Sequence, residues 1–73
     1  MNSPIIFKTF GEVLIVGDVR TNTIGFSKNG IKFSNYKVTR IHNNPVDIAI
    51  NADLTDKEIV NYIGHLVSHM VKD

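Results

Sequence analysis

The sequence predicts a small α+β fold: a mostly antiparallel sheet of four or five strands, with one C-terminal helix packed on one of its faces. Three observations favour this fold. Asn29-Gly30 joins two β-rich runs, Val13–Val16 is a continuous apolar run, and residues 56–72 repeat apolar side chains with a helical period. The 73 residues form one domain, residues 1–73, because a chain of this length has no room for a second core.

The first two strands are predicted at residues 5–10 and 12–17. The stretch "IIFKTF" mixes β-favouring Ile and Phe with Lys and Thr, and Gly11 interrupts the run. The stretch "EVLIVG" is largely apolar, which is typical of a strand covered on both faces, so we expect it in the middle of the sheet. Residues 18–22, "DVRTN", have turn chemistry and predict a loop.

A hairpin is predicted from strands 23–28 and 31–41, joined by Asn29-Gly30. Both central positions of a type I′ turn need positive φ, which Asn and Gly tolerate best. A two-residue turn sets three cross-strand pairs: Lys28 with Ile31, Ser27 with Lys32, and Phe26 with Phe33.

The second strand of this hairpin carries a change of phase. After Phe33 the apolar residues move from odd to even positions, at Tyr36 and Val38. A slip of one residue would turn every later side chain to the wrong face, so we expect a bulge near Ser34-Asn35.

The last two elements are predicted as a strand at residues 46–50 and a helix at 56–72. Val46, Ile48 and Ile50 alternate with Asp47 and Ala49, the pattern of a half-buried strand. For the helix, Thr55 followed by Glu58 indicates a capping box, and Lys72 suits the negative end of the helix dipole.

The net charge of +1 conceals a division along the chain. Residues 1–45 carry six basic and two acidic residues, a charge of +4, whereas residues 46–73 carry two basic and five acidic residues, a charge of −3. Such asymmetry is found at nucleic-acid surfaces, partner surfaces and head-to-tail contacts, and it also arises by chance among solvated charges.

Several classes of chemistry lack their motifs. The chain has no cysteine, which excludes disulfides and cysteine-based zinc sites, and it has no G-x-S-x-G nucleophile motif or phosphate loop. We therefore expect no enzymatic activity and no cofactor. The longest apolar run is too short to cross a bilayer, and residues 1–10 do not resemble a signal peptide, so we expect a cytoplasmic location without membrane association.

The pair His65-x-x-x-His69 is the most chemically suggestive motif. Two histidines at this spacing can bind zinc or respond to pH. A metalloprotease requires Glu after the first His, but Leu66 stands there, and the third ligand would be Asp73 at the last position of the sequence. We predict no metal site and interpret the pair as the polar edge of a packing helix, with a pH response left as an alternative.

Function is predicted from the width of the helix's apolar arc. Val60, Val67 and Val71 extend this arc to about half the cylinder, more than one sheet needs. With His65 and His69 on its flank, they are the predicted partner-binding residues. The chain is thus expected to be a small non-enzymatic adaptor or inhibitor that binds a protein, or a second copy of itself, through a sheet edge, the C-terminal helix or both.

Two alternatives stay open. The hairpin 23–41 suggests nucleic-acid binding through Lys28, Lys32, Tyr36, Lys37 and Arg40, although no RNP motif, zinc finger or helix-turn-helix is present. A structural subunit of a larger assembly is the second alternative. Ten Ile, eight Asn and six Lys fit an AT-rich genome, and small proteins of this kind are frequent among phage products; the cytoplasm would then be that of the host cell.

Overall fold

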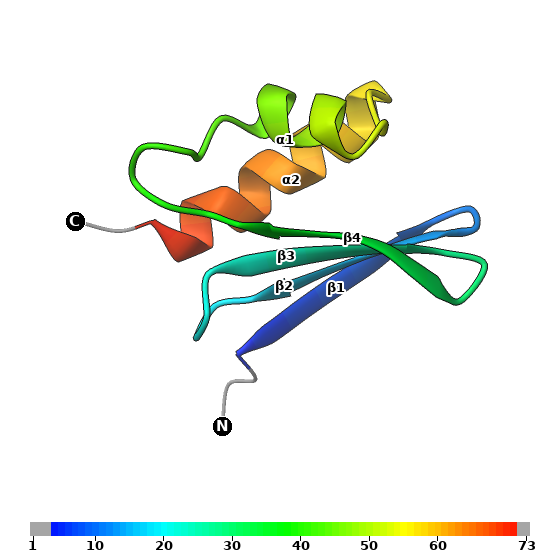
Figure 1. Cartoon of the computed structure of the whole chain (residues 1–73), viewed down its shortest axis with the longest axis horizontal. Helices are drawn as coiled ribbons and strands as arrows, with labels where there is room; N and C mark the ends of the chain where they lie inside the picture. The colour runs from blue at the N-terminus through cyan, green and yellow to red at the C-terminus, as the bar shows by residue number, and fades with distance from the viewer. Residues whose placement is uncertain (1–3, 72–73) are drawn as a thin grey trace.

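The computed structural model describes residues 4–71 and confirms the α+β fold, with an antiparallel sheet and a C-terminal helix. Both helices lie on the same side of the sheet (Figure 1). In chain order the elements are β1 (Ile5–Phe10), β2 (Val13–Asp18), β3 (Thr23–Lys28), β4 (Ile31–Lys37), α1 (Pro45–Asn51) and α2 (Lys57–Met70).

The sheet is a meander in which the strand order β1-β2-β3-β4 repeats the order in the chain. Each strand pairs antiparallel with its sequence neighbour. As predicted, β2 lies inside the sheet, and β1 and β4 are its edges. The prediction that both faces of this strand are covered is wrong for the described chain. Val13 and Ile15 are buried beneath the helices, but Leu14 and Val16 on the other face are only half-buried.

The hairpin between β3 and β4 has the predicted turn. Asn29 and Gly30 have φ angles of 56° and 79°, the positive values that a type I′ turn requires. The pairs next to the turn also match the prediction: Lys28 with Ile31, and Ser27 with Lys32.

Beyond these pairs the register differs from the predicted one. Phe26 pairs with Ser34 and not with Phe33, because the bulge falls at Phe33 itself, one residue before its predicted place. The two rings still lie close, with centroids 6.3 Å apart. The bulge resolves the phase change as expected: Tyr36 packs against the core and pairs with Ile24.

Strand β4 ends at Lys37, so the prediction that it continues to residue 41 is wrong. The next residue, Val38, is buried and donates its N–H to the Asn22 carbonyl at 2.7 Å. The chain then turns on itself, since the Thr39 N–H donates to the His42 carbonyl and the His42 N–H donates to Thr39 Oγ1. Thr23, the first residue of β3, already pairs with Lys37, so β3 offers no further partner and the backbone groups after β4 bond locally.

The predicted strand at residues 46–50 is wrong, because this segment is helix α1. Asn44 caps it by accepting the Val46 N–H at 2.9 Å, and Pro45 occupies the first turn, where its missing N–H costs nothing. Helical spacing turns Ile48, Ala49 and Ala52 toward the core. Val46 and Ile50, predicted to point inward, are instead exposed.

Helix α2 begins one residue later than predicted. Its cap is Asp56, whose carboxylate accepts the Glu58 N–H at 2.9 Å, so the predicted capping box of Thr55 and Glu58 does not form. The helix ends at Met70 with Val71 as its C-cap. Lys72, expected near the end of the helix, lies outside the described residues.

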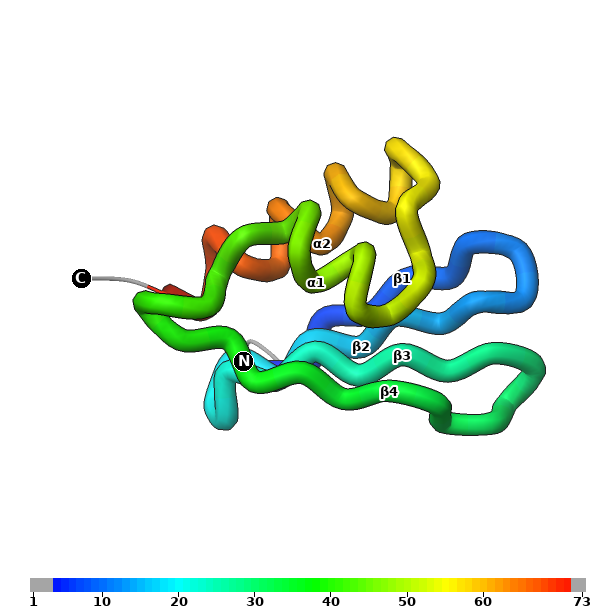
Figure 2. The backbone as a smooth tube through the Cα atoms, turned by 45° about the horizontal axis from the view of Figure 1, so that its top comes forward, coloured from blue at the N-terminus to red at the C-terminus, as the bar shows by residue number. Residues whose placement is uncertain are grey.

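The core lies between the sheet and the two helices (Figure 2). Gly17 on β2 lets α2 approach closely, because a Cβ atom there would lie 2.9 Å from both Leu66 Cδ2 and Met70 Cε. The largest fully buried side chains come from both layers: Phe26, Ile15, Ile24, Ile48, Ile63, Leu66 and Val38.

Candidate functional site

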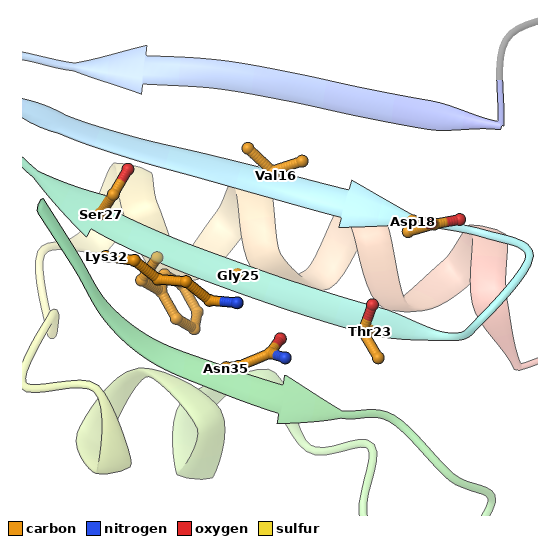
Figure 3. A pocket seen from close by; sticks show the side chains of 8 residues that line it. Val16, Asp18, Thr23, Gly25, Ser27, Lys32 and Asn35 are labelled. Carbon is orange, nitrogen blue, oxygen red and sulfur yellow. The ribbon is translucent and has the colours of Figure 1, made fainter. Parts of the chain in front are cut away.

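The side of the sheet that faces away from the helices is here called the open face. Residues directly opposite each other in neighbouring strands share a face, so the register identifies its members. One row runs across all four strands, from Phe7 through Val16 and Gly25 to Asn35. Within residues 4–71 no helix covers this face, and Figure 3 shows it with the helices behind the sheet.

The open face is divided into an apolar half and a polar half. On β1 and β2 it presents Ile5, Phe7, Leu14 and Val16, of which Phe7 is 68% exposed and Ile5 is 44% exposed. On β3 and β4 it presents polar side chains, because Thr23 pairs with Lys37, Gly25 with Asn35, and Ser27 with Lys32. The face thus offers an exposed aromatic ring beside a cationic, hydrogen-bonding surface.

A shallow hollow of about 320 Å³ lies in the polar half (Figure 3). Gly25 forms its floor, since a Cβ atom there would meet nothing closer than Asn35 Oδ1 and the Val16 carbonyl oxygen, each 3.9 Å away. Lys32 and Asn35 extend from β4 toward Gly25, and Thr23, Ser27 and Asp18 stand at the rim. Val16 and Phe26 also line it, so hydroxyl, amide and ammonium groups stand around a small depression whose surface is largely apolar.

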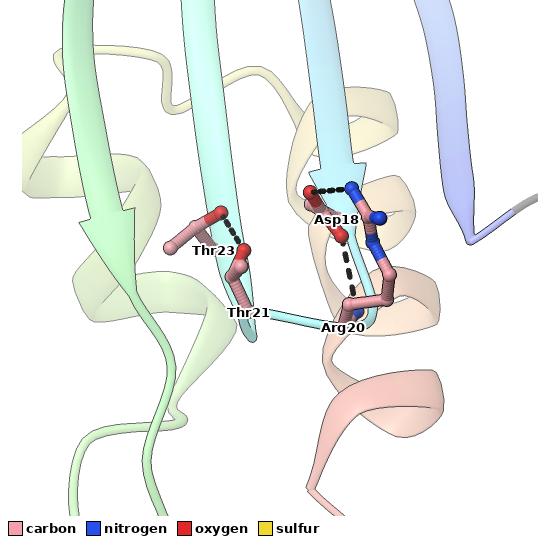
Figure 4. A network of polar contacts seen from close by, with 4 residues as sticks. All are labelled: Asp18, Arg20, Thr21 and Thr23. Atoms are coloured by element: carbon pink, nitrogen blue, oxygen red, sulfur yellow. Dashed lines mark hydrogen bonds and ion pairs between the residues drawn. The ribbon is translucent and has the colours of Figure 1, made fainter.

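The carboxylate at the rim of the hollow is already engaged (Figure 4). Asp18 accepts the Arg20 backbone N–H at 3.0 Å, and the Arg20 guanidinium lies 3.5 Å from its second oxygen. Burial alone would raise the pKa of Asp18, but the hydrogen bonds and positive charge of Arg20 outweigh it, so the net pKa is lowered. Because Arg20 offsets this negative charge, Lys32 and Lys37 make the open face cationic.

A row of rings lies at the other side of the molecule, where α2 passes the β1 edge. The Phe10 and Tyr62 rings are 5.6 Å apart, Tyr62 and His65 are 6.1 Å apart, and His65 and His69 are 4.7 Å apart. The Lys8 ammonium lies 5.2 Å from the Phe10 centroid and 5.8 Å from that of Tyr62, within cation–π range. His65 is exposed and His69 is half-buried, so the pair does form the edge of the packed helix.

One polar atom in this row is buried without a partner. Within residues 4–71 the structure gives the Tyr62 hydroxyl no hydrogen bond. Burial raises the pKa of Tyr62 above its usual value near 10, because the charged phenolate would lose its hydration. This hydroxyl is inaccessible to a reacting group, and it therefore adds no chemistry to the site.

The predicted partner-binding valines Val60, Val67 and Val71 are half-buried and pack against the core. The arc of α2 is wide because α1 lies beside it, with Pro45 Cγ 3.6 Å from the position of a Cβ on Gly64 (Figure 2). A second helix of the same chain therefore uses much of the surface that the sequence left for a partner.

The structure divides the predicted nucleic-acid-binding residues among several places. Lys32 and Lys37 lie on the open face, but Tyr36 lies on the helix side and packs against the core. Lys28 lies next to the hairpin turn and pairs with Val13 and Ile31, and Arg40 is exposed in the segment after β4. The lysines and the one tyrosine in this set do not form a single surface.

Two further observations bear on function. Within residues 4–71 no group of three His, Asp or Glu residues lies together as a metal site would require, and Asp73, the proposed third ligand, lies outside this range. In the same range, no helix has both the length and the hydropathy needed to cross a membrane.

Ile5, Phe7 and Gly25 were not among the predicted site residues. In a strand, Phe7 points to the side opposite Ile6 and Lys8, but periodicity cannot tell which side of a strand the helices will cover. Gly25 was visible only as a glycine within a strand, which often marks a place where another group approaches closely.

Comparisons with known proteins add no relative from which a function could be transferred: no family model, curated protein or solved structure matches the chain.

Proposed function

We propose that this chain is a small non-enzymatic protein-interaction module that binds its partner through the open face and the adjoining β1 edge. The observation that supports this most is the exposure of Phe7, an aromatic side chain 68% exposed beside Ile5, Leu14 and Val16. Clustered exposed apolar residues with a polar rim are typical of interaction surfaces. Aromatic residues of this kind also contribute much of the binding energy in protein interfaces.

The polar half of the face supports recognition rather than catalysis. Lys32, Asn35, Thr23 and Ser27 offer donors and acceptors around a shallow depression, which suits a partner's side chain. The depression is open to solvent and therefore does not exclude water as a reaction site would. If the partner stays permanently on this face, the chain is a structural subunit. This alternative uses the same surface and differs only in the lifetime of the complex.

The test is affinity capture from an extract of the source cells with three forms of the chain. We expect wild type to retain a specific protein and Phe7→Asp to bind it about 30-fold more weakly, the effect of losing a hot spot of about 2 kcal/mol. Ile41→Asp is the matched control, because Ile41 is 85% exposed but lies outside the open face. Capture that is equal for all three forms, or no specific capture by wild type, would contradict the proposal.

Nucleic-acid binding is a second proposal, supported by Lys32 and Lys37 on one face of β4. It ranks lower because Tyr36, the ring predicted to lie among these lysines, is on the opposite side, and the exposed ring of the open face, Phe7, lies on β1 at the other edge of the sheet. Binding of single-stranded DNA or RNA should then appear at about 50 mM salt, where electrostatic attraction is strong, and weaken in Lys32→Glu/Lys37→Glu. No binding at that salt concentration removes this proposal.

A further inference from the structure

The two layers of the molecule carry charges of opposite sign. The open face presents Lys32 and Lys37, while Asp18, its one carboxylate among residues 4–71, is offset by Arg20. The helical layer, residues 45–71, carries four exposed acidic residues against one Lys, a charge of −3. The acidic residues are Asp47, Asp53, Asp56 and Glu58.

Each layer also has an exposed apolar patch that faces away from the core. On the sheet it is formed by Ile5 and Phe7. On α1 it is formed by Val46 and Ile50, which are 50% and 57% exposed and lie one helical turn apart, with exposed Asp47 between them in sequence. One surface is apolar and cationic, and the other is apolar and acidic.

We propose that the outer side of α1 in one copy of this chain binds the open face of the next copy, so that copies stack head to tail. This inference rests on the proposed function, because it names the partner of the same open face. In the stack, Val46 and Ile50 lie against Ile5 and Phe7, and Asp47 approaches Lys32 or Lys37. Each internal sheet is then covered by helices on both faces, an arrangement in which sheets are commonly stable.

The charges disfavour the two symmetric alternatives. Joining two open faces would bring the Lys32 and Lys37 side chains of both copies together without a carboxylate to offset them. Pairing two β1 edges would bring in Lys8, whose charged end lies beside that edge over Phe10 and Tyr62, and charged side chains on an edge strand oppose strand addition. Of these three contacts, the one between unlike layers joins opposite charges.

A head-to-tail contact uses two different surfaces, so each can be disabled separately. Phe7→Asp disables the open face, and Val46→Asp/Ile50→Asp disables the helical surface; all three positions are exposed, so the fold should survive. Lys32→Glu/Lys37→Glu is a second open-face variant in case Phe7→Asp unfolds. Far-ultraviolet circular dichroism and thermal unfolding check the fold of each form, and Ile41→Asp is again the matched control.

The measurement is mass by light scattering of the purified chain as a function of concentration. At about 50 mM salt, where screening is weak, wild type and Ile41→Asp should grow beyond a dimer, and higher salt should reduce their mass. Each disabled variant alone should remain monomeric. An equimolar mixture of Phe7→Asp and Val46→Asp/Ile50→Asp should form a dimer and nothing larger, because each partner retains one working surface.

Three results would overturn the inference: a wild type that stays monomeric at every concentration, a disabled variant that still dimerises alone, or a mixture that remains monomeric while wild type associates. Failure here is distinguishable from failure of the proposed function. If purified wild type is a monomer but still captures another protein in a Phe7-dependent manner, the open face binds a different partner. If both experiments fail, the open face is not a protein-binding surface.

Discussion

At the scale of single residues, the buried Tyr62 hydroxyl is the clearest local cost in the structure. Within residues 4–71 it accepts and donates no hydrogen bond, although its ring packs between Phe10 and His65. A buried polar group without a partner loses its hydration and gains nothing in return, at a cost of about 1–3 kcal/mol. The ring stabilises the contact between α2 and β1, while the hydroxyl opposes it.

Tyr62→Phe should therefore keep the packing and remove the cost. At about pH 7 we expect a free energy of unfolding equal to that of wild type or up to about 1 kcal/mol higher. The folded pKa of Tyr62 is raised because the folded state disfavours the phenolate. The stability that comes from keeping this phenol protonated is therefore fully present below about pH 10 and is lost as the pH rises through the folded pKa. The difference in favour of Tyr62→Phe should thus increase above about pH 10.

Urea unfolding at about pH 7 and about pH 11 measures both effects. Tyr36→Phe is the control, because it removes the hydroxyl of the chain's other tyrosine. A loss of more than about 1 kcal/mol in Tyr62→Phe at neutral pH would mean that the hydroxyl has a partner after all.

At the scale of elements, two glycines on neighbouring strands face opposite layers and should respond in opposite ways. Gly17→Ala places a methyl group 2.9 Å from Leu66 Cδ2, and Leu66 is fully buried with little room to move, so we expect a loss of about 1–3 kcal/mol. Gly25→Ala meets only atoms at 3.9 Å and restricts the unfolded chain, so we expect no loss, or a gain of up to about 1 kcal/mol. Equal effects in thermal unfolding would mean that α2 does not rest on Gly17.

Helix α1 depends on its cap because seven residues are too few to be stable alone. Asn44→Ala removes the acceptor for the Val46 N–H and should lower the free energy of unfolding by about 1 kcal/mol. Asn44→Asp keeps an acceptor and should be close to wild type. Urea unfolding of both variants measures the difference; an Asn44→Ala chain as stable as Asn44→Asp would show that the cap contributes nothing.

The same segment was predicted as a strand, and its sequence explains why. Residues 46–50 alternate apolar and polar side chains as a strand does, yet Ile48, Ala49 and Ala52 also fall on one side of a helix. Both periods fit so short a run, and the contacts of the finished core decide between them. Asn44-Pro45 was the signal that favoured a helix, since Asn caps helices and Pro suits their first turn. The Asn29-Gly30 turn was predictable because local geometry alone requires it.

At the scale of the whole molecule, the charge division in the sequence became a division between layers. The excess of acidic residues after residue 45 lies in the helical layer, and the lysines of β4 lie on the open face. The sequence predicted opposite charges but not the surfaces that carry them. Which side of the sheet the helices cover depends on contacts between distant segments, and for that reason Phe7 was not recognised as exposed.

The meander topology has a consequence for the order in which the chain can fold. Every strand pairs with its neighbour in sequence, and a turn as short as Asn29-Gly30 loses little entropy on closing. Contacts between near neighbours favour rapid folding. During synthesis, all four strands are complete at residue 37, before α1 and α2 emerge at residues 45–70. Until those helices arrive, Ile15, Ile24 and Phe26 have no cover, so the nascent sheet is apolar on its helix side and carries further apolar residues on the β1 and β2 half of its open face.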